Sequence, residues 1–167
     1  MLAKTNTELD KVGLREEILA FEALIREQNE VFLGDSEICP LKHTFSDGIY
    51  VREIFIPKGT YLTGKIHKHE HPNFLMSGTV DVVTEAGREQ LTAPLSIISP
   101  PGTKRALYAV TDLVWITVHS NPTNTQDLEK LEKEVIADSY KAYTAFIENK
   151  HKPTLLARFI NKLKRII

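Results

Sequence analysis

The sequence predicts a mainly β protein with flanking α-helices, whose strands form an antiparallel sandwich or barrel. Residues 41–121 contain short runs rich in β-branched and aromatic side chains, separated by Gly, Pro and Asp. Residues on either side instead place apolar side chains three and four positions apart, as amphipathic helices do. Because no helical pattern interrupts the strand region, an antiparallel arrangement is favoured over a βαβ sheet.

The composition fits one globular domain. The chain has 167 residues and a formal net charge of -1, so it lacks the basic field on which general nucleic-acid binding relies. A single cysteine, Cys39, cannot form an intramolecular disulfide, and the first residues lack the apolar run of a secretory signal. No stretch approaches the length of about 20 apolar residues that spans a bilayer. These features predict a cytoplasmic protein without a nucleic-acid partner.

The N-terminal segment, residues 1–40, is predicted to contain one amphipathic helix from Glu8 to about Gln28. Thr7 is a suitable N-cap for this helix. Asp10, three residues later, places a negative charge in the first turn, where it interacts favourably with the helix dipole.

The central segment, residues 41–121, is predicted to form the barrel. Turn-forming residues separate its strands, as at Ser46-Asp47-Gly48 and Pro100-Pro101-Gly102. The predicted strands are residues 49–56, 61–69, 73–84, 96–99, 105–110 and 113–119.

The C-terminal segment, residues 122–167, returns to a helical period. An apolar stripe runs from Leu128 to Phe146, with Thr125 as a plausible cap, and predicts one long helix. Pro153 then predicts the start of a short final helix, because proline is tolerated at a helix start and not in its interior.

This final helix, residues 153–167, gathers its apolar side chains on one side and Arg158, Lys162 and Arg165 on the other. Such a cationic amphipathic helix can pack on its own barrel, pack across a dimer, or lie on an anionic membrane. We favour protein packing, because the near-zero net charge adds little attraction to lipid. The apolar surface of the terminal helices also predicts a homo-oligomer, most simply a symmetric dimer.

Three histidines alternate along the chain at His67, His69 and His71. In an extended strand this spacing places all three imidazoles on one face, where they can bind a divalent transition metal such as zinc, iron, copper or nickel. The alternative interpretation is a solvated strand edge. His119, at the end of a predicted strand, is a further candidate ligand or a simple surface residue.

Two segments of the strand region resemble the motifs of the cupin superfamily. The first comprises Ile56-Pro57-Lys58-Gly59-Thr60, His67-Lys68-His69 and Phe74-Leu75-Met76-Ser77-Gly78, and the second comprises residues 98–105. The resemblance covers residues 49–119, less than half of the chain. It implies an antiparallel double-stranded β-helix, also called a jelly-roll or cupin barrel, with one metal bound inside.

The motifs depart from the superfamily pattern at two ligand positions. His71 stands where the motif usually has a metal-binding glutamate, and histidine still has a ligand atom there. Arg105 stands at the position of the last metal-binding histidine, and its permanent cation cannot bind a metal. The resemblance therefore implies the ligand set His67, His69 and His71, with His119 as the further candidate.

Arg105 has a second interpretation, as the anchor of a small-molecule ligand. A guanidinium at a barrel mouth can hold a carboxylate or phosphate through two parallel hydrogen bonds. Alternatively, the side chain points into solvent, because the strand phase cannot be deduced from sequence.

Two functions from different classes follow. The first is a small cupin barrel that binds a divalent metal and a small ligand through its histidine cluster. No separate general base or nucleophile is evident, so an enzymatic activity stays open. The second is a non-enzymatic structural or virion-associated accessory protein, because the strand ending 115–122 is similar to that of cupin-like proteins encoded by bacteriophages, and its partners would then be virion proteins.

Overall fold

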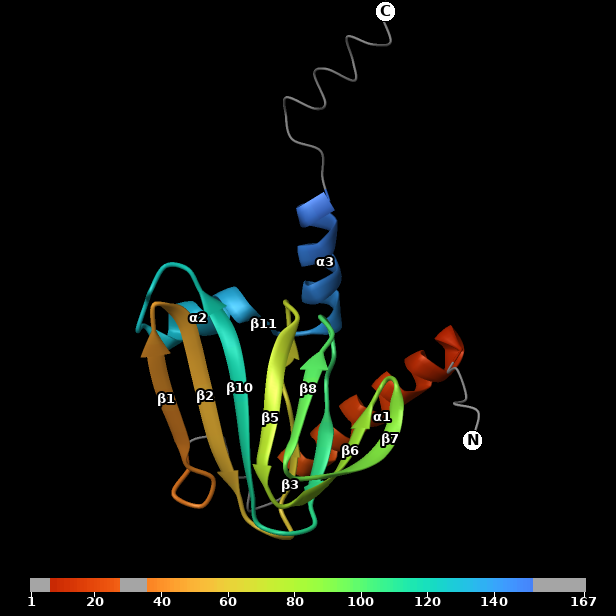
Figure 1. Ribbon diagram of the computed structural model, residues 1–167. Coiled ribbons are helices and arrows are strands. Elements are labelled where there is room, and N and C mark those ends of the chain that lie inside the picture. The colour runs from red at the N-terminus through yellow and green to blue at the C-terminus, as the bar shows by residue number, and fades with distance from the viewer. Residues whose placement is uncertain (1–6, 28–35, 152–167) are drawn as a thin grey trace, which may run out of the picture.

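The computed structural model describes residues 7–27 and 36–151 (Figure 1). The predicted final helix, residues 153–167, lies outside the described residues. No helix among the described residues is long and apolar enough to cross a membrane.

Two antiparallel sheets form the body of the protein, and a third, two-stranded sheet lies at one end (Figure 1). The five-stranded sheet has the order β1-β2-β10-β5-β8, the four-stranded sheet β3-β9-β6-β7, and the small sheet pairs β11 with β4. The strands are β1 Leu41–Ser46, β2 Gly48–Ile56, β3 Tyr61–Thr63, β4 Ile66–His67, β5 His71–Ser77, β6 Thr79–Thr84, β7 Gly87–Thr92, β8 Leu95–Ser99, β9 Ala106–Ala109, β10 Leu113–Asn121 and β11 Ile136–Ala137. The antiparallel double-stranded β-barrel predicted from the sequence is thereby confirmed.

The interior of the barrel is divided into an apolar and a polar end. Along β10, alternate side chains point inward, beginning with Leu113 and Trp115 and ending with His119 and Asn121. The apolar end is the core of the protein: it comprises Ile56, Leu75, Val80, Val82, Leu91, Leu107, Ala109, Leu113 and Trp115. Because the pairing joins His71 to Ser99 and His119 to Tyr50, the polar end lies where β5 begins and β10 ends.

Gly78 divides what the sequence predicted as one strand, residues 73–84, into β5 and β6. Its φ of +87° lies in the left-handed region, and a Cβ there would stand 2.3 Å from the carbonyl oxygen of Asp112. Glycine is therefore required both for the backbone conformation and for the close approach of the neighbouring chain. The tight turn allows β5 and β6 to belong to different sheets.

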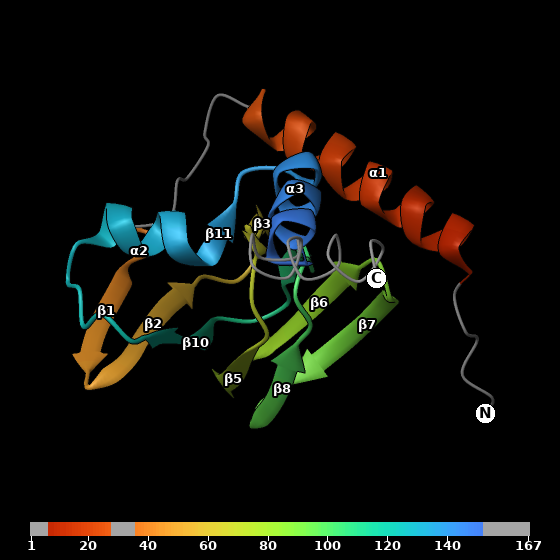
Figure 2. The ribbon, with the colours of Figure 1, turned by 90° about the horizontal axis from the view of Figure 1, so that it is seen from above.

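Helix α1, Glu8–Arg26, packs against β3, β6 and β9 of the four-stranded sheet (Figure 2). The predicted cap is confirmed and is a full capping box, because Thr7 Oγ1 accepts from the amide of Asp10 at 3.2 Å and Asp10 Oδ2 accepts from the amide of Thr7 at 2.8 Å. The buried Lys104 Nζ fastens this helix by donating to Glu22 Oε1 at 2.9 Å and to the carbonyl of Gly64 at 2.9 Å. A buried ion pair with these extra hydrogen bonds fixes where α1 lies on the sheet.

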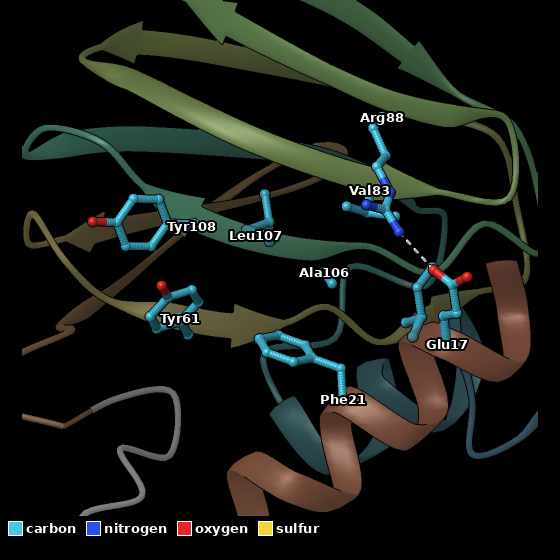
Figure 3. Close-up of a pocket in the computed structure, with 9 residues that line it drawn as sticks. Glu17, Phe21, Tyr61, Val83, Arg88, Ala106, Leu107 and Tyr108 are labelled. Atoms are coloured by element: carbon cyan, nitrogen blue, oxygen red, sulfur yellow. Dashed lines mark hydrogen bonds and ion pairs between the residues drawn. The ribbon is translucent and has the colours of Figure 1, made fainter.

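A cavity of about 290 Å³ lies between α1 and the four-stranded sheet (Figure 3). Phe21, Tyr61 and Tyr108 contribute aromatic walls, and Arg88 bonds to Glu17 at its edge over 2.7 Å. Glu17 is the one carboxylate among the nine lining residues, and it is engaged in that ion pair. The cavity shares no residue with the histidine-rich end of the barrel, so we place the candidate site in the barrel.

The C-terminal segment corrects the prediction of one long helix. Helix α2, Leu128–Val135, is capped by Asp127 rather than by Thr125, and helix α3 is Tyr140–His151. Between them the chain becomes extended as β11, which pairs with β4 through Ile136 opposite His67. Backbone pairing with a distant strand thus outweighs the local helical period, and it brings the two helices to the polar end of the barrel (Figures 1 and 2).

Candidate metal centre

Three histidines from three different strands meet at the polar end of the barrel. His67 ends β4, His71 begins β5 and His119 lies near the end of β10. One ligand nitrogen of each lies within 4.8 Å of the others. His71 and His119 are buried, with 2% and 5% of their surface exposed, so the group lies inside the protein rather than on a solvated edge.

The three imidazoles pack against one another. Ring centroids are 4.1 Å apart for His67 and His71, 4.9 Å for His67 and His119, and 4.8 Å for His71 and His119. Interplanar angles range from 7° to 37°, so the rings are stacked or slightly tilted. This close packing of three polar rings defines a single compact centre, which we call the histidine centre.

The hydrogen bonds of the histidine centre leave ring nitrogens available as ligands. The Nδ1 atom of His71 lies 3.1 Å from the carbonyl oxygen of His69, which favours the tautomer with the proton on Nδ1. The Nε2 atom of His71 and the Nδ1 atom of His67 are buried without a hydrogen-bond partner among the described residues. A ring nitrogen oriented by a carbonyl on its opposite side is typical of metal-binding histidines.

The surroundings keep these imidazoles neutral. Burial, with smaller contributions from His71 and His119, lowers the pKa of His67 from 6.5 to about 2. Burial also lowers the pKa of His119 to about 3 and lowers that of His71. Neutral imidazole is the form that binds metal, so at neutral pH no proton has to be displaced.

The structure does not bring His69 into the histidine centre, where the sequence placed it. The predicted strand 61–69 is interrupted: β4 ends at His67 and the chain bends through Lys68 and His69. Alternation is thereby lost, and the His69 ring packs edge-on against Phe146 of α3 with centroids 5.4 Å apart. His69 instead contributes its carbonyl to His71.

A network of buried polar groups adjoins the histidine centre, and the sequence did not reveal it. Trp115 Nε1 donates to Asn73 Oδ1 at 3.0 Å, and Asn73 Nδ2 donates to Ser99 Oγ at 2.5 Å and to the carbonyl of His71 at 3.2 Å. Asn73 and Ser99 are fully buried. The signal for it was the alternation of β5, which gives Asn73 the same inward phase as His71.

Tyr50 is a second neighbour that the sequence did not reveal. Its ring stacks on His119 with centroids 6.0 Å apart, and its hydroxyl lies 2.7 Å from Nδ1 of His43. Burial raises the pKa of Tyr50. The aromatic wall on this side holds the His119 ring in place from β2.

Arg105 points into the barrel end and not into solvent. Its Nη2 atom donates to Ser99 Oγ, and the guanidinium carbon lies 5.9 Å from the centre of the Trp115 ring. The positive charge of Arg105 lowers the pKa of both His67 and His71. The predicted ligand-binding residue therefore borders the histidine centre.

The histidine centre fits a transition metal in its chemistry. Three neutral imidazoles make a coordination set that leaves one position of a tetrahedral metal open. Two nitrogens bound to one tetrahedral metal are about 3.3 Å apart. The nitrogens of the histidine centre lie within 4.8 Å of one another, so the rings move closer together when they bind one ion.

Comparison with known proteins finds similarity only among solved structures. No protein-family model and no curated protein matches the sequence. The similar structures include KdgF from Halomonas sp., at 13% identity and a TM-score of 0.47 over 62% of this chain and 95% of that one. A cupin 2 conserved barrel domain protein from Salinispora arenicola shares 14% identity with a TM-score of 0.45 over 64% and 95% of the two chains.

A third similar structure is a cupin superfamily protein from Desulfitobacterium hafniense, at 8% identity and a TM-score of 0.44 over 56% of this chain and 92% of that one. The accessory-protein alternative stays a prediction. The assignment of the fold rests on the chain's own strand order. With two facing antiparallel sheets and three histidines inside one end, the described chain forms an antiparallel double-stranded β-barrel.

Proposed function

We propose that this protein binds one divalent transition metal through His67, His71 and His119 and presents it to a small ligand at the polar end of the barrel. The observation that carries the proposal is the meeting of three neutral imidazoles from three strands, one half-buried and two buried. Two of them have a buried ring nitrogen with no hydrogen-bond partner among the described residues. Burying such polar groups is costly unless they are satisfied, and coordination satisfies them.

The chain's own residues would hold the metal rigidly. The carbonyl of His69 orients His71, the Tyr50 ring supports His119, and β11 fixes His67 by pairing with β4. When bound, a metal in such a three-histidine set supplies a Lewis acid with an open position for a ligand atom. The buried Trp115 and the apolar core beyond it exclude water from one side of the centre.

Metal analysis of purified protein tests the proposal. The protein, prepared without chelator and supplied separately with zinc, iron, manganese or nickel, is expected to retain about one equivalent after gel filtration. The variant His67→Ala/His71→Ala should retain essentially none, and His119→Ala should bind at least about tenfold more weakly, as loss of one ligand implies.

His69→Ala is the matched control, because it removes a neighbouring imidazole from the same segment and leaves the histidine centre intact. It is expected to retain metal like the unmodified protein. A wild-type protein that retains no metal with any of the four ions would overturn the proposal and favour the scaffold alternative. A loss in His69→Ala equal to that in the double variant would show that the ligand set is different.

A further inference from the structure

The charge around the histidine centre is positive on two sides. Arg105 approaches from the start of β9, and its one hydrogen bond to a described residue is donated to the neutral hydroxyl of Ser99. Burial lowers the pKa of Arg105, an effect that the carboxylates Glu85 and Glu89 only partly offset. A guanidinium has five N–H donors in a fixed fork, so most of its binding capacity is left over.

Arg52 supplies the second positive charge. It belongs to β2, where it pairs with Thr117, two positions before His119 on β10. Its inward phase is shared with Tyr50, whose ring contacts His119. The charge of Arg52 lowers the pKa of His67 and of His119, whereas that of Arg105 acts on His67 and His71. The two guanidinium groups therefore act on the histidine centre from different strands.

No acidic side chain belongs to the histidine centre: among the described residues, the group able to hold a metal there consists of three histidines alone. Neutral imidazoles do not compensate a divalent cation, and the guanidinium of Arg105 adds to the positive charge. Buried charges in proteins are normally paired. Because no described side chain of the histidine centre supplies negative charge, the site favours an anionic ligand.

We propose that the ligand of this barrel is a small oxyanion, a carboxylate or a phosphate, held by the guanidinium of Arg105 and by the metal of the histidine centre. Two oxygens of such a group match the guanidinium fork, and a further oxygen reaches the open metal position. Arg52 contributes a longer-range attraction. The inference rests on the proposed function for its second anchor, and Arg105 is an anchor in its own right.

A merely structural Arg105 would behave differently. Its contact with Ser99 and its position over the Trp115 ring could serve only to hold the strand ends together. In that case substitution would lower the melting temperature without changing affinity for anions. Affinity, measured apart from stability, distinguishes the two roles.

Isothermal titration calorimetry on zinc-loaded and on chelator-treated protein is the test, with oxalate, inorganic phosphate and the uncharged oxamide as probes. Arg105→Gln is expected to weaken binding of the preferred oxyanion at least about tenfold, as loss of a charge-assisted hydrogen bond implies. Arg105→Lys keeps the charge and loses the fork, so its affinity should be intermediate, and it guards against a folding defect in Arg105→Gln. Arg88→Gln, at an arginine whose side chain is 69% exposed, is the matched control and should bind like the wild type.

The outcomes separate this inference from the proposed function. Stronger binding of oxalate or of phosphate identifies which oxyanion the site prefers, and zinc content measured after each titration excludes extraction of the metal by the probe. The inference is overturned, and the proposed function is not, if the protein retains one equivalent of metal but Arg105→Gln leaves the oxyanion affinity unchanged. The same conclusion follows if oxamide binds as tightly as oxalate. Binding that depends on Arg105 in a protein that retains no metal overturns the proposed function and supports Arg105 as the anchor.

Discussion

Buried imidazoles link the chemistry of the histidine centre to the stability of the fold. In the unfolded chain histidine has a pKa of about 6.5, whereas in the folded protein the pKa is about 2 for His67 and about 3 for His119. Between these values the unfolded state binds more protons than the folded state. The free energy of unfolding therefore rises with pH, and the stability is lost as pH falls below about 6.5.

We predict that chelator-treated protein is less stable at pH 5 than at pH 7 by up to about 2 kcal/mol for each of these two histidines. Urea unfolding at the two pH values measures the difference. The variant His67→Phe/His119→Phe should show a flatter pH profile, because its aromatic rings fill similar space and cannot be protonated. Equal stability of the wild type at pH 5 and pH 7 would contradict the burial of neutral imidazoles.

At the same scale, single residues explain why the ligand set differs from the one expected. The alternation of His67, His69 and His71 places the three side chains on one face only if the strand continues through all of them. The strand ends at His67, where the chain bends, so the prediction fails for His69. His119, which is distant in sequence, replaces His69 because β10 pairs with β2 and β5 in the five-stranded sheet. Lys104 is likewise buried against Glu22 of α1, a contact that its neighbours in sequence do not indicate.

At the scale of elements, tight turns determine which sheet each strand joins. Gly78 and Gly48 both have a positive φ, +87° and +70°, but only Gly78 is crowded, since a Cβ at Gly48 would meet nothing within 4 Å. Alanine substitutions at these two glycines therefore distinguish the free-energy cost of a left-handed backbone conformation from the cost of steric overlap.

We predict that Gly48→Ala lowers the free energy of unfolding by about 1–2 kcal/mol, the cost of a left-handed conformation. Gly78→Ala should lower it by a further 1–3 kcal/mol, roughly the cost of overpacking against the Asp112 carbonyl. Chemical denaturation of both variants provides the measurement. Similar losses in the two would mean that the chain between β9 and β10 moves away without cost.

Elements also compete with their own local preferences. Residues 128–146 have the spacing of one helix, yet β11 interrupts it to pair with β4. The pairing with β11 satisfies the backbone hydrogen-bonding groups of β4, which directly precedes the bend at His69. It thereby helps to position His67. A local pattern cannot reveal such a pairing because its partner is about 70 residues away.

At the scale of the whole molecule, the outer face of the five-stranded sheet carries apolar side chains in solvent. The exposed fractions are 37% for Phe74, 57% for Met76 and 59% for Ile98, which lie on the adjacent strands β5 and β8. The charges that share this face by register, Lys42 and Glu53, cancel. An apolar face without net charge can bind the same face of a second copy, because a two-fold symmetric interface brings the same surface of both subunits together.

We predict a symmetric dimer in solution that uses this face. Light scattering at micromolar concentration should give twice the protomer mass, and Met76→Lys/Ile98→Lys should give a monomer, because burying four lysines at the contact is unfavourable. Thr44→Lys, on the same face at its polar edge, is the control and should remain a dimer. A wild-type monomer, or a double variant that is still dimeric, would show that this face is not the contact.

The sequence by itself determined the features that depend on near neighbours. The strand alternation, the turns at Gly and Pro, and the cap of α1 by Thr7 and Asp10 are local, so period and side-chain chemistry predicted them and with them the barrel. Only the tertiary structure decided which side chains converge: His119 with His67 and His71, Arg105 against Ser99, and β11 against β4. These contacts join distant segments, and the pairing register that creates them is a property of the whole barrel, in which the burial of many side chains together outweighs any single local preference.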